Sequence, residues 1–316
     1  MAIIIRPEDI ERIMAESQPL ASNALDYFKR RPMKASAYAD VMAIEAEVGN
    51  VPVIHRGDTG IRPRMDTKNK LIEPMPIELD DTFTAVELDD YERASSAGKQ
   101  QLIDDKLSIM FNIVRETTRA LCSQACNGKI DYMMKAGNQL VRYVVEYGTV
   151  AKLTTSKSAG SVTVGDIIAT INLLVQTINN QQVGGPVDFV AGKTLFAGIV
   201  NVVSSQRAFN AAVGVGYVDI GGFRIMLDID SYTDIAANGT RSTKTMVGDT
   251  QLMARALNAG QSMPYYKLDD VVLRETVPFY SFTKDRSDQR GTDVYAKSKP
   301  LPLVNTKGIA IMEFAA

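Results

Sequence analysis

The sequence contains no tryptophan, one histidine and two cysteines among its 316 residues. Cys122 and Cys126 cannot build a disulfide framework, which indicates a reducing compartment. The single histidine, His55, cannot complete a catalytic triad or a metal centre, because both kinds of site need further partners. Two thiols four residues apart share one side of a helix, and buried structural thiols are the ordinary interpretation of that spacing. We therefore predict no metal site and no cofactor.

Long apolar runs are also missing. No stretch of about 18 apolar residues is present, so we expect no membrane span. Residues 1–5 are too short for the core of a signal peptide, and we expect maturation in the cytosol. The formal net charge is −2, whereas proteins that depend on phosphate contacts are normally basic, which argues against a dedicated nucleic-acid binder. With 45% hydrophobic residues, the chain can bury the core of one large domain or two modest ones.

Charge is distributed unevenly between two adjacent segments. Residues 71–92 carry eight acids and no base, whereas residues 56–70 are mostly basic. The basic segment holds Arg56, Arg62, Arg64, Lys68 and Lys70 against Asp58 and Asp66. Within residues 51–80 four prolines exclude a helix, and two glycines bracket a turn. This pattern predicts a long two-stranded β-ribbon with a basic tip.

Such a ribbon has few apolar side chains, and a two-stranded element of that kind is only marginally stable by itself. No other part of the chain offers an obvious surface for it. We therefore expect the ribbon to lie on a different subunit.

The strongest local pattern predicts a long helix from about Gly98 to Cys126. Apolar residues recur there at helical spacing, and neither proline nor a further glycine interrupts them. The acids Asp89, Asp90 and Glu92 precede its N-terminus, where the helix dipole favours negative charge. At 1.5 Å per residue the helix is roughly 40 Å long, which is typical of a structural spine.

The remaining segments alternate between helix and strand. We predict short helices from Pro7 and over 20–30, and a hairpin over 130–147. A helix follows from a capping box at Thr163 to about Asn180. Further elements are predicted as a strand at 187–190, a helix at 194–205, a strand at 223–229, a helix near 251–258, and strands at 271–276, 278–283 and 309–314. The fold class is therefore α+β, with residues 161–264 as an inserted subdomain.

Two glycine motifs resemble nucleotide sites but fail their spacing. Gly192-Lys193-Thr194 follows a buried strand, yet a P-loop needs a glycine five positions before Gly192, where Val187 stands. The glycines between 214 and 222 lack the dinucleotide-binding glycine at position 219, which is Asp219. Flexible loops are the ordinary interpretation of both. No other residues assemble into a predicted active site, so we expect no enzyme.

The order of parts resembles tailed-bacteriophage major capsid proteins, and in particular their lambda-type family. The stretches that carry the resemblance are Asn127-Gly128-Lys129-Ile130 with Met133 and Gly137, Val145-Glu146-Tyr147-Gly148, Val187-Asp188-Phe189-Val190 with Lys193, Gly221-Gly222-Phe223-Arg224-Ile225, Asp249-Thr250-Gln251, and the tail from Arg290 to Phe314. Each match is short, and together they cover nearly the full chain.

The resemblance implies the capsid fold with four parts. These are an N-terminal arm at 1–50, an extended loop at 51–85, a peripheral domain with the spine helix at 86–160 and 265–316, and an axial domain at 161–264. It also implies a structural subunit that self-assembles, in hexamers and pentamers, into the icosahedral head shell around the phage genome.

We expect assembly in the host cytoplasm and residence in the virion. Scaffold, portal and decoration proteins are potential partners, and the packaged double-stranded DNA would be contacted weakly on the inner face. The intersubunit candidates are Arg56, Asp58, Arg62, Arg64 and Lys68 of the ribbon, facing Glu87, Asp89 and Glu92 of a neighbour. Alternatively, the two strands simply pair with each other and the charges are solvated.

Three other functions remain open from the sequence. An encapsulin-like nanocompartment shell shares the fold implied above. A P-loop NTPase is disfavoured by the glycine spacing. A tail-tube protein would be smaller and more purely β.

Overall fold

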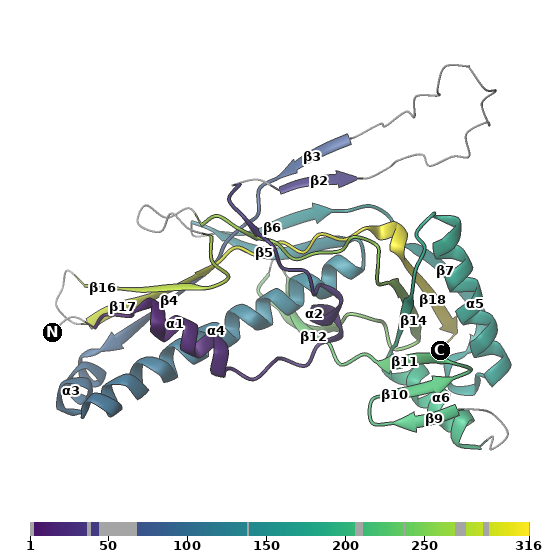
Figure 1. Ribbon diagram of the computed structural model, residues 1–316, viewed down its shortest axis with the longest axis horizontal. Coiled ribbons are helices and arrows are strands. Elements are labelled where there is room, and N and C mark those ends of the chain that lie inside the picture. Colours follow the sequence, from purple (N-terminus) through teal and green to yellow (C-terminus); the bar gives the residue numbers. More distant parts are fainter. Residues whose placement is uncertain are drawn as a thin grey trace, which may run out of the picture.

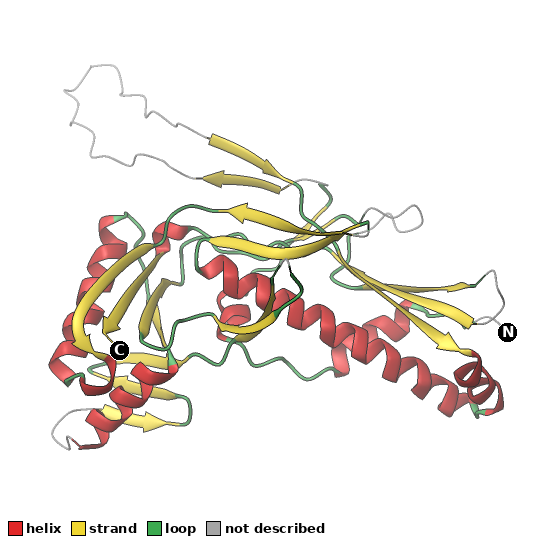
Figure 2. Ribbon diagram, turned by 180° about the vertical axis from the view of Figure 1, so that it is seen from behind, coloured by secondary structure: helices red, strands yellow, loops and turns green. Residues whose placement is uncertain are grey.

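The computed structural model describes residues 3–36, 39–43, 68–137, 139–205, 211–236, 238–268, 276–286 and 291–315. The molecule is elongated, and one long helix, α4 (Ser96–Cys126), runs along it (Figure 1). A sheet with a short helical layer lies at one end, and a larger sheet with two helices lies at the other (Figure 2). The predicted α+β class is confirmed.

The spine helix begins and ends where the sequence predicts. Ser95 caps it by accepting a hydrogen bond from the backbone N–H of Gly98 at 3.3 Å. Its predicted apolar face is buried, from Ile103 through Leu107 to Ala125. The chain leaves the helix through Gly128, whose φ of +84° and close approach to the carbonyl of Gly148 both require glycine.

The end of the molecule near the N-terminus packs around the first half of α4. Here α1 (Pro7–Glu16) lies along α4, and α3 (Ala85–Arg93) precedes it. The antiparallel sheet β16–β17–β4 (Tyr280–Asp285, Gly291–Ser298, Ile77–Thr84) covers the same core. The acids predicted to precede α4 therefore lie on a separate short helix, which the sequence analysis did not predict.

The middle of the molecule packs around the second half of α4. Helix α2 (Asn23–Tyr27) is shorter than the predicted 20–30. The hairpin of β5 (Lys129–Ala136) and β6 (Gln139–Glu146) is confirmed. β1 (Met33–Lys34) pairs with β15 (Tyr265–Tyr266), and β12 (Ser231–Ile235) pairs with β13 (Arg241–Thr245), where no strands were predicted.

The other end is a seven-stranded mixed sheet in the order β7-β18-β14-β8-β11-β10-β9. Its strands are Ala151–Ser158, Ile309–Ala315, Gln251–Ala256, Val187–Ala191, Phe223–Leu227, Tyr217–Ile220 and Ala211–Gly214 in that order. α5 (Val164–Asn180), with the predicted Thr163–Asp166 capping box, and α6 (Lys193–Ser205) pack against it. The glycines between 214 and 222 form the turns between its last three strands.

The predicted helix near 251–258 is wrong, because this segment is the strand β14. β14 lies between β18 and β8, and its residues are buried on both faces of the sheet. Leu252 and Ala254 face the helices, whereas Met253 packs against the core around α4. Leucine, methionine and alanine favour helices locally, but burial on both faces outweighs that preference.

The sheet also crosses the expected domain boundary. Strands β7 and β18 belong to it, although both lie outside the range 161–264 predicted for the axial domain. The division into four parts stays a prediction.

The predicted ribbon differs from the structure at both of its ends. Strand β2 (Ala39–Ala43) pairs with β3 (Lys68–Ile72), so the ribbon begins before residue 51. Residues 77–80 belong to β4, which pairs with β17 of the same chain, so they are not part of it. Residues 44–67, with His55, Arg56, Asp58, Arg62 and Arg64, lie outside the described residues.

Candidate functional site

The structure brings the predicted acidic residues together on α3. Thr84 and Glu87 form a capping box at its start, and Lys106 of α4 lies 3.3 Å from the Glu87 carboxylate. The same ammonium group lies 3.2 Å from Asp81 and 4.7 Å from the centre of the Phe83 ring. Partial burial raises the pKa of Glu87, but the Thr84 hydrogen bonds and the Lys106 cation outweigh it and hold that pKa below its usual value.

A second predicted interface acid also has a cationic partner within its own chain. Asp89 forms an ion pair with Arg93, one helical turn later, at 2.8 Å. Glu92 is exposed on the same helix. Of the basic interface candidates Arg56, Arg62, Arg64 and Lys68, only Lys68 lies within the described residues, at the start of β3. Sequence reasoning missed Lys106 because it is far from these acids in the chain.

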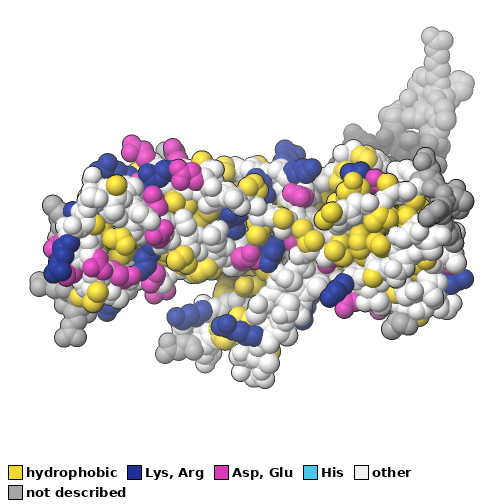
Figure 3. Space-filling view, turned by 90° about the horizontal axis from the view of Figure 1, so that it is seen from below, with side chains coloured by type: hydrophobic (Ala, Val, Ile, Leu, Met, Phe, Trp, Pro, Cys, Tyr) yellow, Lys and Arg dark blue, Asp and Glu magenta, His cyan; other side chains and the backbone are white. Residues whose placement is uncertain are grey.

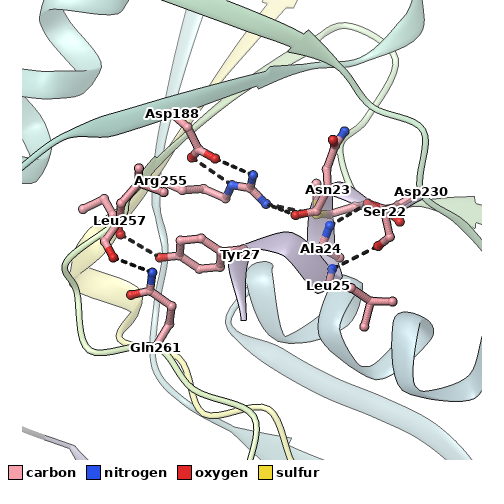
Figure 4. Close-up of polar contacts among 12 residues, drawn as sticks. Ser22, Asn23, Ala24, Leu25, Tyr27, Asp188, Asp230, Arg255, Leu257 and Gln261 are labelled. Carbon is pink, nitrogen blue, oxygen red and sulfur yellow. Dashed lines mark hydrogen bonds and ion pairs between the residues drawn. The ribbon is translucent and has the colours of Figure 1, made fainter. Parts of the chain in front are cut away.

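A buried arginine joins the N-terminal segment to the seven-stranded sheet (Figure 4). The Arg255 side chain of β14 is 1% exposed, and it donates to both oxygens of Asp188 on β8 at 3.1 and 2.7 Å. It also donates to the carbonyl of Asn23 at 2.9 Å and lies 4.7 Å from the centre of the Tyr27 ring. Each of these partners offsets part of the cost of burying a charge.

Helix α2 is fixed at the same joint by three further hydrogen bonds. Asn23 donates to the Leu227 carbonyl at 2.7 Å, and the backbone N–H of Ala24 donates to Asp230 at 2.7 Å. The Tyr27 hydroxyl donates to the Ala256 carbonyl at 3.2 Å. The short helix therefore joins the spine to the sheet.

Asp228 organises the loop beside this joint. Its two carboxylate oxygens accept hydrogen bonds from the backbone N–H groups of Val247 and Asp230, at 2.7 and 3.0 Å. Burial raises the pKa of Asp228 to about 6, with the neighbouring Asp230 adding to the shift. The carboxylate at the end of strand β11 holds backbone in place here.

Two backbone segments approach each other closely at the P-loop-like motif. A Cβ atom on Gly192 would lie 1.9 Å from the carbonyl oxygen of Gly248. The N–H of Leu195, in the first turn of α6, already donates to the Asp249 carbonyl at 3.0 Å. Glycine is required at position 192 because two backbone segments meet there.

Both cysteines are fully buried, as predicted. Burial raises the pKa of Cys126 to about 12. Across the described ranges, no group of three or more histidine, cysteine and acidic side chains could hold a metal ion. No helix among the described residues is both long enough and apolar enough to cross a membrane.

The family model of phage major capsid protein E matches residues 13–312. The chain belongs to this family. It is a structural subunit of the phage head shell, and its place is the virion capsid. No curated protein sequence is significantly similar to it.

Solved structures show the same fold at low sequence identity. A capsid protein of a prophage in E. coli CFT073 superposes with a TM-score of 0.62 at 12% identity, over 99% of this chain and 100% of that one. A phage-related protein from Bordetella bronchiseptica RB50 has a TM-score of 0.57 at 10% identity, over 99% and 98% of the two chains.

The fold extends beyond phages. The SrpI encapsulin of Synechococcus elongatus PCC 7942 has a TM-score of 0.53 at 10% identity, over 98% of this chain and 96% of that one. The fold therefore does not separate a phage head from an encapsulin shell, whereas the family match favours the phage head.

Proposed function

We propose that this capsid protein assembles, through rings of five and six copies, into a closed icosahedral shell that encloses double-stranded DNA. The observation that carries the proposal is the base of the ribbon. Strands β2 and β3 hydrogen bond only with each other among the described residues. They run outward from the body above β6 (Figure 1). A two-stranded element is marginal without support, and a neighbouring subunit supplies that support in a closed shell.

The charges of the ribbon fit this role. Arg56, Arg62, Arg64 and Lys68, with Asp58 among them, are proposed to meet the acid-rich surface of a neighbour that includes Glu87, Asp89 and Glu92. That surface remains acidic in the structure. Residues 78–92 carry seven carboxylates and no base, and the only cation that pairs with both Asp81 and Glu87 among the described residues is Lys106. Because Asp81 and Glu87 share one lysine, negative charge is left over.

The shell subunit is proposed to act without catalysis and to assemble in the host cytoplasm. Scaffold, portal and decoration proteins are its proposed partners. The near-neutral chain suits an inner wall that contacts packaged DNA only weakly, since tight DNA binding requires many phosphate contacts by basic residues.

Electron microscopy of the purified protein tests the proposal. We expect closed icosahedral particles, and for particles purified from phage-producing cells we expect double-stranded DNA inside. An encapsulin-like compartment, the alternative that the shared fold supports, would instead contain a protein cargo and no genome. Sedimentation that shows only a compact monomer under assembly conditions would contradict both.

A further inference from the structure

An apolar cavity of about 430 Å³ opens where the segment between α1 and α2 crosses the spine helix. Leu20 and Leu25 line it from the N-terminal segment, and Phe111 and Val114 line it from α4. Met33, which is 49% exposed, lies at its edge. The apolar lining favours occupation by an apolar side chain.

Two arginines give this cavity a positive rim. Arg31 and Arg115 both line it, and neither forms an ion pair with any described residue. Arg115 is held in place by the Gln18 carbonyl, at 2.7 Å, and by the Phe111 ring, at 5.5 Å. Burial lowers the pKa of Arg115, the neighbouring Glu116 carboxylate acts in the opposite direction, and the cation of Arg31 lowers the pKa further. Asp26 also lines the cavity, but it forms no ion pair with either arginine. Both guanidinium groups are therefore available to stabilise the carboxylate of an incoming partner.

The same chain carries a complementary surface on α3, at one end of the molecule. No residue of α3 is buried, and Val86 is 70% exposed. Asp90 lies four residues later, on the same face of the helix, and its carboxylate has no partner among the described residues. Charged side chains of both signs gather at this end of the molecule, whereas apolar side chains gather toward the other (Figure 3).

Helix α3 contacts β4 and α4 of its own chain and does not line the cavity. We propose that α3 of a second copy docks there, with Val86 in the apolar cavity and Asp90 facing Arg31 and Arg115. The inference rests on the proposed function, since it supplies one of the contacts by which copies associate. Because the two surfaces differ, the contact is head-to-tail and extends into a ring or a shell. The contact uses Val86 and Asp90 and none of Glu87, Asp89 and Glu92, the three acids proposed to meet the ribbon.

A charge exchange between the two surfaces tests this contact. Arg31→Glu and Asp90→Arg each place like charges together, and each should raise the protein concentration needed for assembly by about tenfold or more. The double variant restores opposite charges and should recover assembly to within about threefold of the wild type. Arg241→Glu, which reverses an exposed arginine on β13, is the matched control and should assemble normally. Circular dichroism and sedimentation under non-assembling conditions establish that each variant is a folded monomer.

A cysteine pair provides a readout that does not depend on charge. Val86→Cys subunits mixed with Met33→Cys subunits should form an intersubunit disulfide during assembly. In that step the two thiols lose two electrons and two protons to added diamide. Ile109→Cys, at another exposed apolar position, replaces Val86→Cys in the control mixture and should not crosslink.

The outcomes separate this contact from the proposed function. A wild-type chain that forms no particles contradicts the proposed function and this contact together. Wild-type particles with normal assembly of Arg31→Glu and Asp90→Arg contradict the contact alone. If Arg31→Glu impairs assembly while Asp90→Arg does not, the cavity binds a different partner and the α3 assignment is wrong.

Discussion

A buried guanidinium group is tolerated only when nearly every N–H group finds an acceptor, and Arg255 fulfils that condition at the joint of the molecule. Its two strongest partners are the Asp188 oxygens, which it contacts side-on from the neighbouring strand. The Asn23 carbonyl adds a contact from a segment more than two hundred residues away. A single side chain thus ties the N-terminal segment to the sheet.

Asp188→Ala leaves the Arg255 charge buried without its counterion. We expect the free energy of unfolding to fall by about 3–5 kcal/mol, the usual result of removing one partner of a buried ion pair. Urea unfolding of the isolated subunit measures it. The matched control is Asp219→Ala, which removes the partner of the exposed Arg224 and should change stability little. A loss under about 1 kcal/mol for Asp188→Ala would show that the joint does not depend on this pair.

Asp228 makes stability depend on pH in the direction opposite to most carboxylates. Its pKa of about 6 in the folded chain lies above the ordinary value, so the folded chain binds its proton more tightly than the unfolded chain does. The contribution of Asp228 is therefore fully present below about pH 4 and is lost as pH rises through 6. The raised pKa arises mainly from burial, and the neighbouring Asp230 and Arg255 act in opposite directions on it.

The Asp228→Asn variant isolates this effect. Relative to the variant, the wild-type subunit should lose up to roughly 3 kcal/mol of stability between pH 4 and pH 6.5, and nothing further above that range. Urea unfolding of both proteins across pH 3.5–7.5 gives the difference at each pH. A difference that stays constant over this range would contradict the raised pKa.

At the scale of elements, the connection between β8 and α6 shows how packing can produce a nucleotide-like motif. The carbonyl of Gly248 occupies the space that any side chain at position 192 would need. Glycine therefore stands at position 192 because two backbone segments approach each other there. Lys193 follows it as the first residue of α6 and is exposed.

Gly192→Ala should destabilise the subunit by about 3 kcal/mol or more, because overpacking against backbone cannot be relieved by a side-chain rotation. Gly184→Ala, where no atom lies within 4 Å of the added Cβ and φ is not positive, should change stability by less than about 1 kcal/mol. Thermal unfolding measures both. Magnesium ATP should not raise the melting temperature of the wild type, and a concentration-dependent rise would revive the P-loop interpretation.

Elements with strong local signals were predictable from the sequence, and elements defined by distant contacts were not. The apolar repeat of α4 and the Thr163–Asp166 capping box place both helices correctly within a few residues. β14 was predicted wrongly, because its strand state depends on β18 and β8 on either side. The ion pairs of Lys106 and Arg255 were also unpredictable, since each joins residues that only the fold brings together.

At the scale of the whole molecule, the ribbon and its charges are predicted to act between subunits. Reversing Arg56, Arg62 and Arg64 to glutamate should block shell assembly, because like charges would then face the acid-rich surface of the neighbour. The monomer should remain folded, since the hydrophobic cores among the described residues consist of apolar side chains, none of which this variant changes.

Assembly at low salt, followed by sedimentation and microscopy, is the appropriate measurement, because screening there is weakest. Lys135→Glu, an exposed reversal on β5, serves as the control. Normal particles from the triple variant would show that assembly does not need these charges. The ribbon would then have to be held by its backbone and apolar side chains alone.

The place of β18 in the sheet governs when the subunit can fold during synthesis. This strand lies between β7 and β14, so the sheet has a gap second from its edge until residues 309–315 have left the ribosome. Until then the edge of β14 that pairs with β18 has no hydrogen-bonding partner. The hydrophobic cores on both faces of the sheet also lack the side chains that β18 contributes. We therefore expect chains that stop before β18 to leave the sheet incomplete and to be excluded from the shell.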